Sequence, residues 1–553
     1  MAVLEKSRIF QSEKLDSRIR SANVTGSERW LGFFASPALI YIAYVTMSGT
    51  YLNQFYVDVL KLGGVAGGAF LVLLPILSKV FDAITNLLMG VVIDRTKTRQ
   101  GKARPWLLIS GPILAVTGIL LYAVPQMSLT AQAIWVGVSY NLYFAFAFTT
   151  YNMSQALLVP LSTRNTKQRD SLALFLSMGQ SMIPGALVFI LVPMLLLPAM
   201  GVDRSRWALI MSIISILMLP GVLMQYYFTK ERVSEDATAS KMQAVRLIEQ
   251  IKTCFTDKYW LLFFGMFLLH NVATNIYNSS INFYSNWVLG TYNDGITLTL
   301  INAVGQAPMG LGVFLLWPIA KRFGKRRTLM VGMLIAALGS FIVSVVPTQL
   351  GPVLGAFALK SFGYLPAYLY AAMMAEAMDH IEWKKAFRCD GFTATTQSVI
   401  VTITAGLGTS LFNSGLARNG YVPPVSDTSW VAQNAATKHW FVLCVAVIPA
   451  VIYILISVLA FFYRVEDDSE QIKADITARH RAEAEAAGLV YMSPEEKAAL
   501  EQAEQDRIAE DKRIEELKAL CVRKGLSFDE EEAKYQAKLA EKKAKAEKKR
   551  QQK

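Results

Sequence analysis

The chain has 553 residues, of which 53% are hydrophobic and 18% charged, and its formal net charge at pH 7 is +13. The charges are segregated: few lie within the long apolar runs, whereas residues 464–553 are dense in Glu, Lys and Arg. This pattern excludes an ordinary globular domain and indicates a polytopic membrane protein with a soluble tail.

The apolar runs predict an all-α integral membrane protein with twelve transmembrane helices, because one span needs about 20 apolar residues. The predicted spans are 30–54, 65–93, 105–125, 131–160, 171–200, 206–228, 258–288, 296–320, 328–347, 350–379, 387–417 and 439–463. We expect a cytoplasmic segment at 1–29, six-helix bundles at 30–228 and 258–463, a cytoplasmic linker at 229–257, and a charged, helical cytoplasmic tail at 464–553.

The basic residues predict the orientation. Lys and Arg gather after the second, fourth, eighth and tenth predicted spans and are sparse in the loops on the other side. The positive-inside rule therefore places both termini in the cytoplasm and the protein in the cell membrane. Segment 1–29 has no short apolar core of a removable signal peptide. Basic loops that contact anionic lipid account for the net charge, so we expect membrane lipid and no nucleic acid as a partner.

Asp82 lies in the middle of the apolar run 65–93. A charged residue at the centre of a spanning helix costs about 2.5–3.5 kcal/mol on insertion scales, so such a residue is usually functional. Asp82 is therefore the first candidate for the coupling site of a transporter. Lys79 lies three residues earlier on the same helix face, and the alternative is a simple ion pair between the two.

Neither the four Cys nor the four His show metal-ligand spacing, and no phosphate-binding loop or Ser/His/Asp set is present in the sequence. We therefore expect no structural disulfide, no metal, no cofactor and no enzymatic activity.

Two stretches carry a family resemblance. Residues 79–90 (KVFDAITNLLMG) with 94–106 (DRTKTRQGKARPW), and residues 378–391 (MDHIEWKKAFRCDG) followed by Gln397, resemble the signatures of the glycoside-pentoside-hexuronide:cation symporters. The resemblance covers residues 30–463 and implies the major facilitator fold, in which two six-helix bundles enclose a central substrate cavity.

The resemblance implies symport of a small-molecule substrate, a sugar or glycoside, with Na⁺ or H⁺ by alternating access. The family's cation site falls here on Asp82, Thr85, Asn86 and Thr149, but its second carboxylate is replaced by Asn86. Carboxylate, hydroxyl and amide oxygens still suit a small hard cation. With a single acid, a proton on Asp82 is an equally workable coupling ion.

The family's sugar-binding positions are also changed, because an acidic position of the fourth span falls on Asn152 and a lysine position of the eleventh falls on Thr402. Asn152, Gln397 and Thr402 are the polar candidates that remain for binding substrate.

Asparagines recur along one face of the seventh span. They are Asn271, Asn275, Asn278, Asn282 and Asn286. Such a ladder of amides can hydrogen-bond sugar hydroxyls if it faces a cavity, or it can join the helix to a neighbour. Both interpretations stay open.

Lys360 lies within the tenth predicted span, with Tyr364 one turn along the same face and no acid nearby in that span. It could pair with a substrate carboxylate, which suggests an anionic sugar. The alternative is a lysine that reaches the membrane surface or pairs with another helix.

Charged residues at the cytoplasmic ends of the spans are candidates for a gate. They are Asp94, Arg95, Arg104, Asp379 and Arg388. We expect them to form ion pairs that stabilise the outward-facing state and break when the inner gate opens.

The tail contains a helix-start signature at 493–496, Ser-Pro-Glu-Glu, which predicts a solvated or surface-bound helix. We expect a monomer. Two alternatives to sugar symport remain: a carrier of lysolipid-like solutes, which needs a lateral apolar opening, and a non-transporting sensor or scaffold that acts through its tail.

Overall fold

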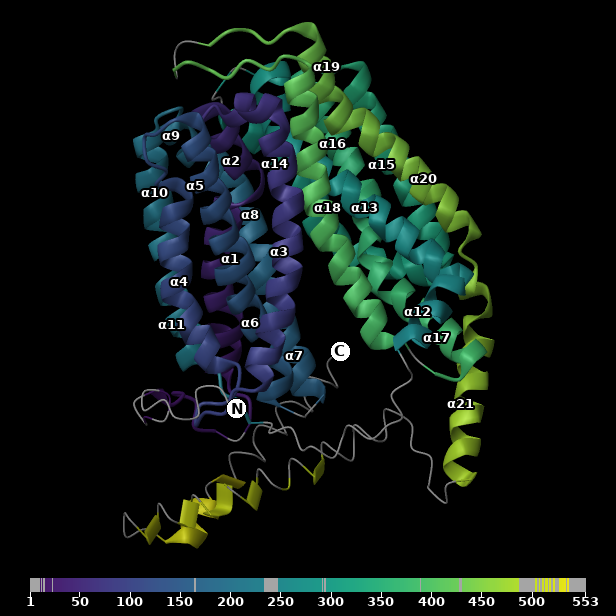
Figure 1. The fold of residues 1–553 in the computed structure, drawn as a ribbon. Coiled ribbons are helices and arrows are strands. Elements are labelled where there is room, and N and C mark those ends of the chain that lie inside the picture. Colours follow the sequence, from purple (N-terminus) through teal and green to yellow (C-terminus); the bar gives the residue numbers. More distant parts are fainter. Residues whose placement is uncertain are drawn as a thin grey trace.

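The computed structural model describes residues 10–486, except for 11, 13–14, 22, 164–165, 233–246, 291, 293–294, 388 and 427–429, and scattered positions between 503 and 536. Every regular element within these residues is helical. The helices form two halves that lie side by side (Figure 1). The predicted tail helix that starts at 493–496 begins outside the described residues.

The first half begins with a helical segment that contains α1 (Ser36–Met47) and α2 (Gly49–Gln54). Its other helices are α3 (Ala69–Asp94), α4 (Arg104–Tyr122), α5 (Leu129–Asn141), α6 (Thr149–Ser162), α7 (Thr166–Ser177), α8 (Ile183–Leu191), α9 (Leu197–Met200), α10 (Arg204–Ile216) and α11 (Met218–Tyr227). Within the fourth predicted span, a π-helical turn over Leu142–Phe148 joins α5 directly to α6.

The second half is preceded by α12 (Leu247–Thr256). Its helices are α13 (Lys258–Tyr284), α14 (Gly295–Phe323), α15 (Lys325–Val345), α16 (Leu350–Tyr364), α17 (Tyr370–Lys385), α18 (Asp390–Arg418), α19 (Ala435–Val442) and α20 (Ile448–Phe462), and α21 (Ser469–Ala486) follows them.

Nine helical segments in the described part of the chain are long and apolar enough to cross a membrane. The predicted spans 131–160, 296–320 and 350–379 are helical but not among these nine. The first of them carries Asn141, Thr149 and Thr150, and the last is interrupted by a 3₁₀ turn at Leu365–Leu369, where Pro366 lies. The helix α14 runs over Gly295–Phe323, but its apolar stretch, Gly295–Gly305, is too short to count as a span. Polar and helix-breaking residues therefore mark the less regular spans.

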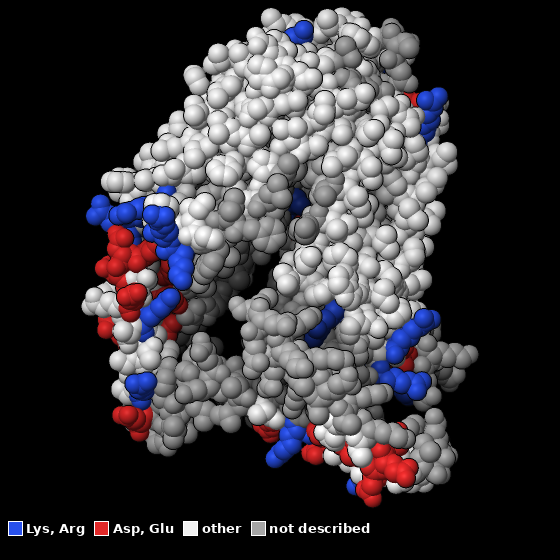
Figure 2. Space-filling view, turned by 180° about the vertical axis from the view of Figure 1, so that it is seen from behind, with Lys and Arg blue, Asp and Glu red and all other residues white. Residues whose placement is uncertain are grey.

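The two ends of the molecule differ in charge. Charged side chains gather toward the lower end in Figure 2, where Figure 1 places α7, α17 and α21. We call this the basic end, because the Lys- and Arg-rich loops after α3 and α14 lie there, and we call the end with α9 and α19 the opposite end.

In each half, one glutamate caps the helix that begins after the basic loop. This glutamate follows the last spanning helix of the same half. In the first half, the Glu231 carboxylate accepts hydrogen bonds from the backbone N–H groups of Lys102, Ala103 and Arg104, at 2.8–3.0 Å. In the second half, the Glu466 carboxylate accepts from Lys325 and Arg326, at 2.8 and 3.0 Å. These acceptors satisfy the free N–H groups at the starts of α4 and α15.

The helix α21 packs against α17 at the basic end. Trp383 Nε1 donates to Asp475 over 2.9 Å, His480 Nε2 lies 2.9 Å from Glu382 Oε1, and Ile472 of α21 is buried. The first part of the charged tail is thus attached to the second half.

Candidate functional site

Hydrogen bonds between the halves close the seam at the opposite end. Asn53 and Asn413 exchange side-chain hydrogen bonds at 3.0 Å, and Asn413 also donates to the carbonyl of Leu71. Asn282 of α13 donates to Gln54 of α2 over 2.6 Å. These side chains are buried, so their hydrogen bonds across the seam are shielded from solvent.

Glycine allows the helices to approach closely along this seam. A Cβ atom on Gly406 of α18 would lie 2.9 Å from the carbonyl oxygen of Pro75 and 3.2 Å from Cγ of Lys79, both on α3. A Cβ atom on Gly295 of α14 would lie 1.7 Å from the carbonyl oxygen of Pro193. Only glycine fits these contacts between the halves.

The ion pairs found at the basic end join residues of the same half. Arg232 pairs with Glu28 in the first half, over 2.8 Å, and Lys325 pairs with Glu376 in the second. Figure 2 shows a deep hollow between the two halves, at mid-height and below. The molecule is therefore joined at the opposite end and hollow toward the basic end.

Asp82 lies on α3, and three side chains bind its carboxylate. Thr149 Oγ1 of α6 and Asn86 Nδ2 donate to Oδ1 over 2.8 and 3.1 Å, and Lys79 Nζ lies 3.3 Å from Oδ2. The Asp82 side chain is 16% exposed and that of Lys79 is 23% exposed. This cluster combines one carboxylate with polar groups inside a spanning segment.

Thr85 is oriented differently from the other members of the predicted cation set. Its hydroxyl lies 3.0 Å from the backbone carbonyl oxygens of both Phe81 and Asp82, so it bonds to its own helix. The structure brings Asp82, Asn86 and Thr149 together and adds Lys79, while Thr85 contributes no bond to the carboxylate.

A polar network that the sequence did not reveal lies close to this cluster. Asn152, one turn after Thr149 on α6, accepts a hydrogen bond from Tyr41 of α1 over 3.2 Å. Gln180, in the π-helical turn before α8, donates to Tyr41 and to Gln155 over 3.1 and 2.6 Å. Polar residues within apolar spans were the available signal, but their spacing did not reveal that three spans converge here.

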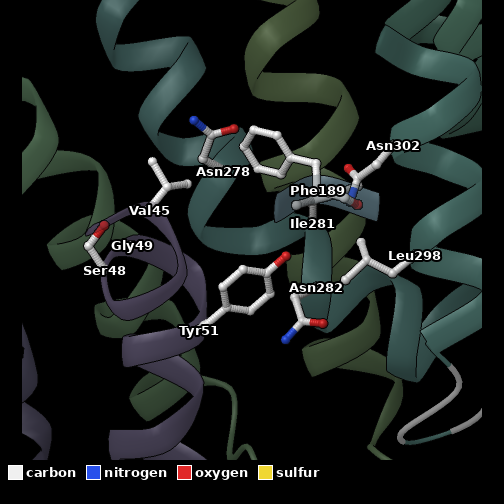
Figure 3. A pocket seen from close by; sticks show the side chains of 10 residues that line it. All are labelled: Val45, Ser48, Gly49, Tyr51, Phe189, Asn278, Ile281, Asn282, Leu298 and Asn302. Carbon is white, nitrogen blue, oxygen red and sulfur yellow. The ribbon is translucent and has the colours of Figure 1, made fainter. Parts of the chain in front are cut away.

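A cavity of about 140 Å³ lies between the halves, toward the opposite end (Figure 3). Its lining comes from α1 and α2, α8, α13 and α14, and the polar side chains that Figure 3 labels there include Ser48, Tyr51, Asn278, Asn282 and Asn302. Because both halves contribute to it, the contents of this cavity can bridge them.

Two members of the asparagine ladder of α13 take the roles expected of it. Asn278 lines the cavity, and Asn282 both lines it and bonds to Gln54 of the first half. Asn271 and Asn275 donate to backbone carbonyls of their own helix, those of Phe267 and Asn271. The ladder therefore supplies a cavity-facing amide and a contact between the halves.

Lys360 and Tyr364 of α16 face α13. Tyr364 Oη lies 2.7 Å from Thr274 Oγ1 and 2.8 Å from His270 Nε2. Lys360 is 7% exposed, and its Nζ lies 3.3 Å from the ring centroid of Tyr277. The structure thus buries Lys360 between helices of the second half, so it does not reach the membrane surface.

The other predicted residues lie apart from these contacts. Gln397 and Thr402 are half-buried on α18. Arg95 is exposed at the basic end, and Asp379 is half-buried on α17. Arg104 is buried within the first half, where its guanidinium donates to the carbonyls of Tyr226 and Gln100. The side chain of Asp94 and all of Arg388 lie outside the described residues.

Two halves of spanning helices around a central cavity define a multi-pass membrane transporter of the major facilitator type. Two solved structures share this fold. They are the D-xylose-proton symporter, with TM-score 0.54 at 13% identity over 81% of this chain and 99% of that one, and a bacterial homologue of the human lysosomal transporter Spinster, with TM-score 0.55 at 15% identity over 79% and 99%.

The family model for MFS/sugar transport proteins matches residues 33–467, and the chain belongs to this family. The isoprimeverose transporter of Lactiplantibacillus pentosus is 25% identical over 79% of this chain and 89% of its own length. The inner membrane symporter YicJ of Escherichia coli is 24% identical over 75% and 86%. The resemblance to the glycoside-pentoside-hexuronide:cation symporters is thereby confirmed, and the protein is a secondary transporter, not an enzyme.

Proposed function

We propose that the protein imports a glycoside or related sugar together with Na⁺ or H⁺ by alternating access. The observation that carries this proposal is the Asp82 cluster, in which a carboxylate within a spanning segment binds Thr149 and Asn86. A membrane-embedded acid that gathers polar groups from two helices suits a cation or a proton. The names of the related sugar transporter and symporter support the same conclusion.

The substrate would bind between the halves. Asn278 in the cavity, and Asn152 with its partners Tyr41 and Gln180, offer amide and hydroxyl groups suited to sugar hydroxyls. The rest of the proposed set lies in the second half: Asn271, Asn275, Lys360, Tyr364, Gln397 and Thr402. Thr149 and Asn152 lie one turn apart on α6, so ion and sugar would be sensed by the same helix.

Transport would proceed by rocking of the two halves between this arrangement and one that is closed at the basic end. We propose twelve spans in the ranges given above, cytoplasmic termini and a monomer. In the closed arrangement the charged residues at the basic end, including Asp94, Arg95, Asp379 and Arg388, would pair across the halves. Arg104 already has backbone partners within its half, so we assign it a role in holding α4.

The apolar groove found in the structure does not favour a lipid carrier. It has a volume of about 400 Å³, and the described residues that line it belong to α14, α15 and the segment from α16 to Pro366. It is a feature of the second half, whereas a carried lipid needs an opening that leads to the cavity between the halves.

The test is uptake of radiolabelled glycosides and uronides into proteoliposomes under an imposed Na⁺ or H⁺ gradient. Asp82→Asn should abolish gradient-driven accumulation, because the amide cannot carry the charge that binds the ion. Asp468→Asn makes the same chemical change at an exposed position after α20 and should transport normally. Accumulation in Asp82→Asn that equals that of the native protein would exclude Asp82 as the coupling site.

A further inference from the structure

Lys360 is a buried lysine whose Nζ has no polar partner among the described residues. Its side chain is 7% exposed. What surrounds it is aromatic and backbone: the Tyr277 ring at 3.3 Å, the Phe357 ring at 5.6 Å, and the close approach of Gly339 of α15 to its backbone. A buried lysine normally pairs with an acid or a carbonyl, so this one lacks its usual compensation.

The face of the Tyr277 ring partly compensates for the missing partner. A cation over an aromatic face is attracted to the negative π surface, but this attraction is weaker than that of a charge-assisted hydrogen bond. An anion that came within reach of Nζ would therefore gain more than the ring supplies. The surroundings of Lys360 therefore leave its ammonium group able to bind an anion.

The ring that covers this lysine belongs to a residue next to the cavity lining in the chain. Tyr277 precedes Asn278 in α13 and lies one turn before Ile281, and both of these residues line the cavity between the halves. By helical spacing, Tyr277 thus lies at the edge of the face of α13 that lines the cavity. A ligand in the cavity would need this ring to rotate in order to reach Lys360.

We propose that Lys360 and Tyr277 form an anion subsite, and that the transported sugar carries a carboxylate or a sulfonate. This inference rests on the proposed function and adds the charge class of the substrate. In the first half, the Asp82 cluster is the corresponding group and already has its own partners. In this proposal the first half binds the coupling cation, and the second half binds the anionic end of the sugar.

The experiment compares matched sugars with the native protein, Lys360→Gln and Lys252→Gln, the last being an exposed lysine of α12. Each set of ligands contains a neutral hexoside, the uronide that differs from it by one carboxylate, and the sugar with a sulfonate in the same place. Proteoliposome uptake gives the selectivity, and the shift of the thermal unfolding temperature in detergent gives binding without transport.

We expect the native protein and Lys252→Gln to prefer an anionic sugar of the set. In Lys360→Gln, uptake of that anionic sugar should fall about 100-fold, as when one partner of a buried charge pair is removed, while uptake of the neutral hexoside should change little. Without ligand, Lys360→Gln should unfold at the same or a higher temperature, because it replaces an uncompensated cation. Anionic sugars should raise the unfolding temperature of the native protein and not that of Lys360→Gln.

Equal losses for neutral and anionic sugars, or a less stable Lys360→Gln with unchanged selectivity, would overturn the anion subsite and leave sugar symport in place. If the native protein accumulates no sugar at all, the proposed function is what fails. The unfolding measurements still judge the subsite in that case, because ligand binding shifts the unfolding temperature whether or not transport occurs.

Discussion

The two halves share a helix-capping glutamate at the basic end and differ in the charged residues within their spans. In each half a glutamate beyond the last helix caps the helix after the basic loop, Glu231 for α4 and Glu466 for α15. Within the spans, the first half holds Asp82 with three partners, whereas the second holds Lys360 with an aromatic ring. The parts that position helices are repeated, while those that would meet ion and substrate have diverged.

The largest expected difference between the halves concerns the glycine in each basic loop. Gly101 has φ +109°, and a Cβ atom there would lie 2.2 Å from a carboxylate oxygen of Glu231. Gly101→Ala should cost about 3 kcal/mol, because it strains the backbone and displaces the capping carboxylate. Gly324 has φ +85°, and its Cβ would lie 3.0 Å from Glu466. Gly324→Ala should cost about half as much. Thermal unfolding in detergent compares them, and a more harmful Gly324→Ala would contradict the ranking.

The second-largest expected difference between the halves is the contribution of each capping glutamate to stability. Glu231→Ala leaves three backbone N–H groups without their acceptor and should cost about 2 kcal/mol, and Glu466→Ala leaves two and should cost about 1 kcal/mol. Burial raises the pKa of Glu231, and the backbone N–H groups of Arg104, Lys102 and Ala103 oppose that rise. The control is Glu470→Ala, an exposed residue of α21 that should change unfolding little. Equal unfolding of Glu231→Ala and the control would disprove the capping role.

Acid sensitivity should reside in the second half. Burial alone would raise the pKa of Asp257. The hydrogen bonds from His380 and from the backbone N–H of Trp260 outweigh this effect and hold the pKa below its usual 3.8. Asp257 therefore stabilises the fold at pH values above 3.8, and this contribution is lost as the pH falls through the lowered pKa. Asp257→Asn should cost about 1 kcal/mol at pH 7, and progressively less as the pH falls below 3.8 toward the lowered pKa. Unfolding of both proteins across this range measures it, and a pH-independent difference would refute it.

Exposed ion pairs should matter least in both halves. Arg326 lies 3.3 Å from Asp467, whose side chain is 54% exposed, and Arg99 lies 3.0 Å from Asp16, which is 42% exposed. Because water screens such pairs, Asp467→Asn and Asp16→Asn should each change the unfolding free energy by less than about 0.5 kcal/mol. A larger effect in one half alone would show that this pair holds more than a surface contact.

For different reasons, the sequence could predict the nine apolar spans of the described residues and the Asp82 cluster. Spans follow from the length of apolar runs, and Asp82 with Asn86 follows from the helical repeat. The partner Thr149, 67 residues away, came from the family pattern. Thr85 was expected to face the same ion, but a threonine in a helix can bond to the carbonyls of its preceding turn, and here it does.

The contacts between segments far apart in the chain could not be predicted. Nothing in the repeat of asparagines tells that Asn282 meets Gln54 of the other half, because helical spacing fixes a face but not the neighbour of that face. The same limit applies to Tyr41 with Gln180 and to Lys360 over Tyr277. The position of α21 was missed because its composition is that of a solvated helix, although Ile472 is buried.

The close contact at Gly406 links the seam to the Asp82 cluster. Because this position has no side chain, the stem of Lys79 lies against α18 while its ammonium group rests on Asp82. The lysine thus serves as a resident counterion whose placement depends on the distance between the halves. If Asp82 is the coupling site that we propose, an empty carrier in this arrangement would hold its aspartate neutralised, and separation of α3 from α18 would free the carboxylate for an external ion.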